Sequence, residues 1–233
     1  MAPHTLTLTE YMRADDATVT TQVNALAARL TTKHGADVAT DTAAVRAAPT
    51  WLEGAELLSL RLHEQFPGDI GMFAPFMLNH VVISPGEAFF MAANEPHAYL
   101  SGDTIEVMAG SDNVVRAGLT PKLKDVPTLT AMLTYNTGAP PVTSGHALSA
   151  HVRRFTPPVP DFAVERVAVP PGTTLELPGQ PGAAICLVVS GSASDGERAW
   201  ASGSAALQPA GVTVSLTASG DSECLLFRAF PNA

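Results

Sequence analysis

The sequence predicts a mainly β protein made of jelly-roll β-sandwich units, with a helical segment at its N-terminus. Two observations predict the strands. Pro-Gly pairs recur between short apolar runs along the chain, and several of these runs alternate apolar with polar residues. A third observation concerns residues 1–68, where two long proline-free stretches place apolar residues three and four positions apart. That spacing is typical of amphipathic helices.

The two helices are expected at residues 16–33 and 52–66. The first carries apolar side chains at helical spacing, and Pro67-Gly68 ends the second. A short third helix is expected at 125–133, because Asp125 is well suited to accept a hydrogen bond from the first turn.

From residue 69 the pattern predicts short strands between turns. Residues 69–135 are expected to form part of one β domain, with strands near 78–83, 88–91, 98–100, 105–108 and 114–115. Residues 136–148 are rich in Gly, Pro, Ser and Thr, a composition typical of a linker. A domain boundary is therefore expected there.

Residues 149–233 are expected to be nearly all strand. Alternation is plain in the run from Val164 to Val169 and again in Thr174–Leu177. The expected strands lie at 162–169, 173–177, 183–191, 204–209, 212–218 and 223–230. Two sheets packed face to face would give a cupin-like β domain.

Composition narrows the class of protein. The 233 residues are 46% hydrophobic and 15% charged, and the formal net charge is −9. A net negative surface argues against nucleic acid or anionic lipid as partners. Neither a signal peptide nor an apolar run long enough for a membrane span is apparent. Cys186 and Cys224 lie in apolar runs, so we expect buried thiols and a cytoplasmic location.

The candidate functional residues lie between residues 61 and 126. The turn Asn94-Glu95-Pro96 precedes His97, and an imidazole presented from a strand suits a metal site. The next positions crowd acids and bases into an otherwise apolar region: Tyr99, Glu106, Asp112, Arg116 and Lys122. Taken singly, these residues are better explained without a function: His97 and Asp112 as turn residues, and Glu106 and Lys122 as solvated side chains. Together they indicate an anion or metal pocket.

Two segments carry a resemblance to a known family. They are LRLHEQFPGDIGMF at 60–73 and EPHAYLSGDTIEVMAGSDNVVRAGLTPKLKDV at 95–126. Both resemble the type I mannose-6-phosphate isomerases (phosphomannose isomerases), and the likeness corresponds to the C-terminal portion of that family. It implies a zinc-dependent cupin enzyme that interconverts mannose 6-phosphate and fructose 6-phosphate, an early step toward GDP-mannose.

The resemblance also implies roles for individual residues. His97 matches a zinc ligand, and Arg116 matches the arginine of the catalytic site. Four further residues match positions that line the pocket: Tyr99, Glu106, Asp112 and Lys122. Isomerisation through a cis-enediol needs a proton relay, which Glu106 or Asp112 would provide. Lys122 would hold the phosphate and Tyr99 would contact the sugar.

The sequence departs from the family in its zinc ligands. The Gln-x-His pair and the Lys-Pro-Glu segment that supply the other three ligands do not occur here. His80, Glu87 and Glu95 are the local residues of suitable type to replace them. Two other readings remain open: a non-catalytic cupin that binds a sugar phosphate or a partner, and a different metal-dependent cupin such as an oxygenase. Missing strands would also favour self-association or pairing with a complementary N-terminal segment.

Overall fold

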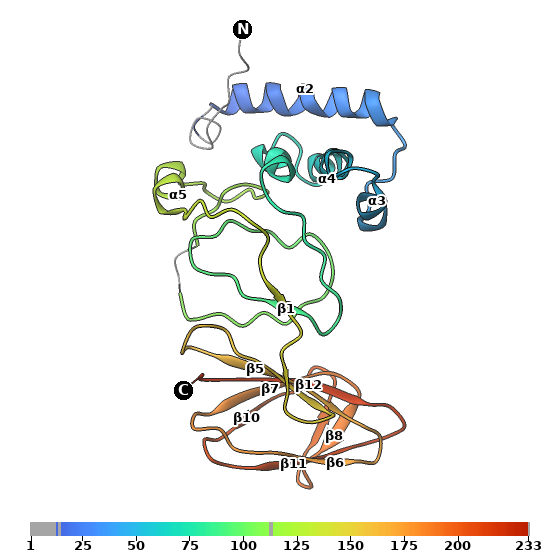
Figure 1. Cartoon of the computed structure of the whole chain (residues 1–233), viewed down its shortest axis with the longest axis vertical. Coiled ribbons are helices and arrows are strands. Elements are labelled where there is room, and N and C mark those ends of the chain that lie inside the picture. Colours follow the sequence, from blue (N-terminus) through green and yellow to red (C-terminus); the bar gives the residue numbers. More distant parts are fainter. Residues whose placement is uncertain (1–12, 14, 112–113, 233) are drawn as a thin grey trace. The chain divides into compact units, whose positions relative to one another are not determined.

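The computed structural model describes residue 13, residues 15–111 and residues 114–232, which form two compact units (Figure 1). The first unit contains the described residues up to Val82, together with 91–102 and 114–139. The second contains 83–90, 103–111 and 140–232. Mainly β structure with an N-terminal helical segment was predicted, and both features are confirmed.

The two long helices of the first unit are confirmed as α2 (Asp16–His34) and α4 (Trp51–Gln65). Asp15 caps α2, because its side chain accepts a hydrogen bond from the backbone N–H of Thr18. Thr50 caps α4 in the same way by accepting from the N–H of Glu53. Pro67-Gly68 follows α4, where the turn needs the positive φ of 76° that glycine adopts freely.

Three shorter helices complete this unit. The predicted short helix is confirmed as α5 (Val126–Met132), with Asp125 accepting from the N–H of Thr128. Two helices were not predicted from the sequence: α3 (Thr42–Ala47) and the 3-10 helix η1 (Ile70–Phe76). Both are too short to leave a clear hydrophobic period in the sequence.

The helices are held together by apolar packing and one ion cluster. The buried face of α2 places Val23, Ala27 and Leu30 against Met72 of η1. The carboxylate of Glu56 on α4 accepts hydrogen bonds from Lys33 Nζ at 2.6 Å and from His34 Nε2 at 2.7 Å. This cluster therefore fixes the last turn of α2 to the middle of α4. No helix in the described ranges is long and apolar enough to span a bilayer.

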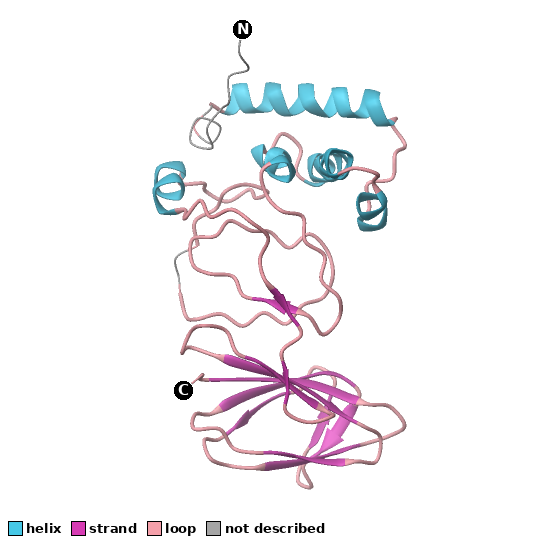
Figure 2. Ribbon diagram, in the orientation of Figure 1, coloured by secondary structure: helices cyan, strands magenta, loops and turns pink. Residues whose placement is uncertain are grey.

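The prediction of strands between residues 77 and 115 is mostly wrong. Among the described residues there, only Ala88–Phe89 (β1) forms a strand, and it pairs with Val142–Thr143 (β2). The stretches near 78–83, 98–100, 105–108 and 114–115 are drawn as loop in Figure 2. A strand needs a neighbour that accepts and donates its backbone hydrogen bonds, and no described segment provides one for these stretches.

The C-terminal strands are confirmed and form two antiparallel sheets. The six-stranded sheet has the order β10-β7-β12-β5-β4-β3, and the four-stranded sheet has the order β6-β11-β8-β9. Six of these ten strands match expected ones: β5 (Ala163–Val169), β6 (Thr174–Leu177), β7 (Ala184–Ser190), β10 (Ala205–Gln208), β11 (Val214–Ala218) and β12 (Cys224–Phe230). The others were not anticipated: β3 (His146–Ala147), β4 (Val152–Phe155), β8 (Ser192–Ser194) and β9 (Ala199–Ala201).

The core of the second unit lies between these sheets. Every second residue of β12 is buried, which is the alternation expected when one face of a strand packs inward. Cys186 and Cys224 are buried free thiols, as predicted, and burial raises the pKa of Cys186 to about 11. β2 and β3 lie within the stretch 136–148 that was expected to be a linker. The domain limits drawn from the sequence stay a prediction.

A cluster of charged side chains is buried inside this unit. Glu165 on β5 has no exposed surface, and its carboxylate binds two guanidinium groups. Arg228 Nε donates to Glu165 Oε2 at 2.6 Å, and Arg154 Nε and Nη2 donate to Oε1 at 2.8 and 2.6 Å. Arg228 also donates to Gln208 Oε1 at 3.0 Å, and both guanidinium groups lie over the ring of Phe230. Burial is tolerated because every charge has a partner.

We predict that Glu56→Gln weakens the attachment of α2 by about 1 kcal/mol at neutral pH, because its contacts with Lys33 and His34 lose the carboxylate charge and Lys33 is half exposed. Burial raises the pKa of Glu56, but the hydrogen bonds from Lys33 and His34 outweigh burial and hold it below its ordinary 4.5. A carboxylate with a lowered folded pKa stabilises above its unfolded pKa, and the contribution is lost as the pH falls through the folded value.

The measurement is urea unfolding followed by circular dichroism across an acidic pH series, with Glu64→Gln on the exposed side of α4 as the matched control. The wild type and Glu56→Gln should converge at low pH. A stability difference that stays constant down to the most acidic point would contradict the assignment.

We predict that Glu165→Ala destabilises the second unit by about 3–5 kcal/mol, because it leaves the buried guanidinium of Arg228, with the partly exposed one of Arg154 nearby, without a counter-ion. The double variant Glu165→Leu, Arg228→Met should lose less than the single one, since it removes the buried charges together. Thermal unfolding reported by the buried Trp200, in a Trp51→Phe background, separates this unit from the helices. A double variant less stable than Glu165→Ala would refute the idea that uncompensated charge is the cause.

Candidate functional site

His97 lies on an exposed loop of the first unit, directly after the turn that contains Asn94. Its Nδ1 is 2.8 Å from the carbonyl oxygen of Glu95. A carbonyl oxygen only accepts, so Nδ1 is the donor, and a neutral ring then carries its lone pair on Nε2. This is the arrangement in which a backbone carbonyl orients a histidine for a metal ion or another acid.

The turn before His97 is fixed by contacts from a distant part of the chain. The carboxylate of Glu95 accepts from the hydroxyl of Thr134 and from Asn136 Nδ2, the latter at 2.9 Å. These hydrogen bonds hold the pKa of Glu95 below its ordinary value. Asn94 adopts the left-handed φ of 66° that asparagine tolerates. The loop therefore presents His97 from a defined backbone position.

Tyr99 is the one predicted site residue in ring contact with His97. The two ring centroids are 5.7 Å apart and the planes are tilted by 50°. Tyr99 is 54% exposed. The structure brings these two predicted residues together.

Arg116 and Lys122 lie on a second loop of the same unit, between residues 114 and 124. Arg116 is half-buried and Lys122 is exposed. Neither side chain forms an ion pair with any described residue. Their positive charges are therefore not neutralised by a carboxylate within the described part of the chain.

Asp69 contacts this loop and was not predicted from the sequence as a residue of the site. Its carboxylate is almost buried and accepts from the backbone N–H of Leu119, at 2.8 Å, in the middle of the loop. The signal available was its place in the Pro-Gly-Asp turn of the segment 60–73. Sequence alone does not show that the two segments meet, because fifty residues separate them.

The two candidate proton relays are placed differently. Glu106 is exposed and belongs to the segment 103–111 of the second unit. Asp112 lies outside the described residues. Their assignment from the sequence stays a prediction.

The described residues do not by themselves fit a catalytic zinc ion. Among them, no group of three His, Cys, Asp or Glu side chains could hold a metal. Of the local candidates, Glu87 accepts from the N–H of Ser84 at 2.6 Å, and Glu95 is engaged by Thr134 and Asn136. A catalytic zinc needs three protein ligands and an open position, and His97 offers one ligand.

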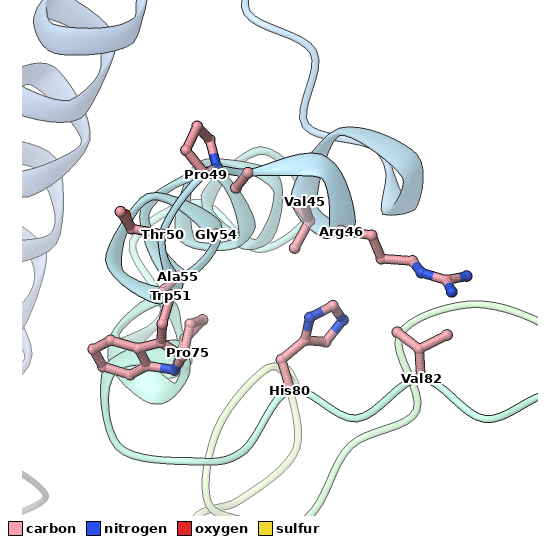
Figure 3. Close-up of a pocket in the computed structure, with 11 residues that line it drawn as sticks. Val45, Arg46, Pro49, Thr50, Trp51, Gly54, Ala55, Pro75, His80 and Val82 are labelled. Atoms are coloured by element: carbon pink, nitrogen blue, oxygen red, sulfur yellow. The ribbon is translucent and has the colours of Figure 1, made fainter.

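A pocket of about 410 Å³ opens at the start of α4 (Figure 3). Thr50 and Trp51 line one side, and His80 points toward Val45 and Arg46. Burial, Arg61 and Arg46 together lower the pKa of His80, so its ring is neutral at physiological pH. Apart from His80, none of the described residues that were predicted to belong to the site lines this pocket.

Comparisons with known proteins agree with the resemblance seen in the sequence. Residues 6–78 match a family model described as the helical insertion domain of type I phosphomannose isomerase. Mannose-6-phosphate isomerase 2 of Arabidopsis thaliana is 49% identical over 140 residues, which are 60% of this chain and 32% of that protein. The Bos taurus mannose-6-phosphate isomerase is 49% identical over 142 residues, 58% of this chain and 33% of that protein.

Solved structures extend the likeness beyond the matched sequence. The apo form of mannose 6-phosphate isomerase from Salmonella typhimurium has a TM-score of 0.73 and 29% identity, covering 97% of this chain and 55% of that one. This chain thus spans about a third of the length of the curated relatives and about half of the solved one. The sequence and the mainly β, cupin-like architecture of this chain are thus similar to those of type I phosphomannose isomerases.

Proposed function

We propose that this chain takes part in the interconversion of mannose 6-phosphate and fructose 6-phosphate, and that it supplies the groups that bind the phosphate and stabilise developing charge. The observation that carries this proposal is the spacing of two residues. In the Salmonella typhimurium enzyme, a histidine and an arginine nineteen positions apart were each replaced by alanine in separate crystal structures. His97 and Arg116 are also nineteen positions apart.

The chemistry of the reaction gives each residue a task. A proton leaves C2 of the aldose and a proton returns at C1, while negative charge develops on oxygen in the cis-enediol. The permanently charged guanidinium of Arg116 would stabilise that charge, and Lys122 would hold the phosphate. Tyr99 would contact the sugar ring. Glu106 or Asp112 would move the proton.

We propose zinc as the cofactor of the complete site, where it would act as a Lewis acid on the substrate oxygens. His97 would provide one ligand through Nε2, since the Glu95 carbonyl occupies Nδ1. The described residues do not form the rest of such a site, so no step is derived through the metal. We infer that the remaining ligands come from a complementary N-terminal segment of the family fold.

Exposed apolar side chains support that inference. They occur on stretches that a cupin would order as strands: Leu78, Val81, Val82, Ile105, Met108 and Val114. Unpaired extended backbone with apolar side chains is a natural template for added strands. Self-association through the same stretches is the other way to cover them.

The second candidate function is binding of a sugar phosphate without turnover. It is favoured by the lack of a metal-binding group among the described residues. In either case the ligand is a small phosphorylated sugar and not nucleic acid or membrane, as the net charge of −9 favours. The two unpaired thiols suit a reducing compartment, so a cytoplasmic location is proposed.

We predict that the purified 233-residue chain, given zinc, retains far less than one metal ion per chain and does not isomerise mannose 6-phosphate. A single imidazole holds zinc too weakly to survive gel filtration. Metal analysis and turnover on the same sample are the measurements. About one zinc per chain together with turnover would show that His97 has found replacement ligands.

In any preparation that isomerises mannose 6-phosphate, Arg116→Ala should lower kcat/KM by about 10²–10³, as expected for removal of a group that stabilises developing negative charge. Thermal stability should change little, because Arg116 has no ion-pair partner among the described residues. Arg29→Ala, on the exposed side of α2, is the matched control. Equal losses of stability and turnover would overturn the catalytic role.

A further inference from the structure

Asp69 joins two distant segments of the first unit through one side chain. Its Oδ1 accepts from the backbone N–H of Gly71 at 2.7 Å and from that of Leu119 at 2.8 Å. Lys124 Nζ lies 3.5 Å from the other oxygen, Oδ2. The side chain is 11% exposed, so both N–H groups depend on this carboxylate more than on water.

The two segments are also packed backbone against backbone. A Cβ on Gly118 would lie 2.9 Å from Asp69 Oδ1 and 3.1 Å from the backbone of Gly71. A Cβ on Gly71 would lie 2.6 Å from the side chain of Leu119. Neither glycine tolerates a side chain without movement, and the contact is therefore close enough to transmit a displacement of one segment to the other.

The loop needs this support because its backbone is strained. Leu119 has a φ of 54°, in the left-handed region that a leucine rarely adopts. Such a conformation persists only where the surroundings hold it. Here the carboxylate of Asp69 accepts from the N–H of Leu119, and the side chain of Leu119 packs against the cluster of Val45, Leu58 and Leu62.

The strained residue lies three positions after Arg116 and three before Lys122. Val115 and Ala117 pack with Ile70, so the backbone on either side of Arg116 is anchored to the segment that begins at Asp69. The side chains of Arg116 and Lys122 point from this anchored backbone without a carboxylate partner among the described residues. The position of Asp69 therefore affects the backbone positions from which the side chains of Arg116 and Lys122 extend.

We propose that Asp69 is a positioning residue for the phosphate-binding and charge-stabilising loop, acting through the N–H of Leu119. The proposal rests on the sugar-phosphate function proposed above. The simpler alternative is that Asp69 only caps η1 through Gly71. A cap would affect stability but would not affect the affinity for a phosphorylated ligand through Lys122.

The experiment compares Asp69→Ala, Asp69→Asn and Lys124→Met in the full chain. Asparagine keeps an oxygen that can accept from both N–H groups, and Lys124→Met removes only the long ion pair. Hydrogen exchange at the Leu119 amide and the affinity for mannose 6-phosphate, by calorimetric titration, are measured for each. Asp69→Ala should speed Leu119 exchange and weaken binding by about tenfold or more, as loss of group positioning predicts. The other two variants should stay within about threefold of the wild type.

Two further variants keep the test decisive. Gly118→Ala leaves Asp69 in place but forces the segments apart, and should weaken binding as Asp69→Ala does, even if Asp69→Ala folds poorly. Combining Asp69→Ala with Lys122→Met should cost little more affinity than Lys122→Met alone, because coupled residues are not additive. Additive losses, or an unchanged Leu119 amide in Asp69→Ala, would overturn the proposal.

These outcomes separate the two proposals. If the wild-type chain does not bind mannose 6-phosphate, the function proposed for the chain alone fails. Leu119 exchange then decides the role of Asp69 by itself. Fast exchange in Asp69→Ala with retained protection in Asp69→Asn supports positioning of the loop, and equal protection in both refutes it.

Discussion

Backbone pairing is the constraint on which the rest of the structure depends. A β-strand satisfies its N–H and C=O groups only beside another strand in register. In the six-stranded sheet, β12 pairs along its length with β5 and also with β7, so its backbone groups are used on both sides. The apolar stretches near 78–83 and 105–108 have no such neighbour among the described residues and remain irregular. Backbone pairing therefore orders the strands of the sandwich, whereas the site loops have to be stabilised by other contacts.

Polar side chains supply those supports, and they work differently in the two units. In the second unit, the carboxylate of Glu165 joins the guanidinium groups of Arg154 and Arg228 inside a formed sandwich. In the first unit, Asp69 and Glu95 bind backbone and side-chain donors of loops that no sheet holds. The carboxylates of Glu165 and Asp69 have little or no exposed surface, so they fix their two or three donors more firmly than the exposed carboxylate of Glu95 does.

Local patterns made much of the fold predictable from the sequence. Helical spacing and N-caps located α2, α4 and α5, and alternation located the strands from Ala163 to Phe230. The errors arose where a non-local partner decides the outcome, as it does for the unpaired runs between 77 and 115. The site shows the same division. The roles of His97 and Arg116 were predicted from motifs and stay a prediction, whereas the contact of Asp69 with Leu119 joins residues fifty positions apart and leaves no local signal.

The charges of the site loops separate two tasks that a sugar-phosphate isomerase must perform. Arg116 and Lys122 carry permanent or strongly basic charge and have no carboxylate partner among the described residues. Such a cation on an anchored loop is suited to an anionic ligand, since no ion pair with a described residue has to be broken first. Holding a metal needs several converging donors, and within the described ranges no group of three His, Cys, Asp or Glu side chains could hold one. This difference is why the proposed function gives the phosphate end of the substrate to this chain, and why the ligands that would complete a metal site are proposed to approach Nε2 of His97.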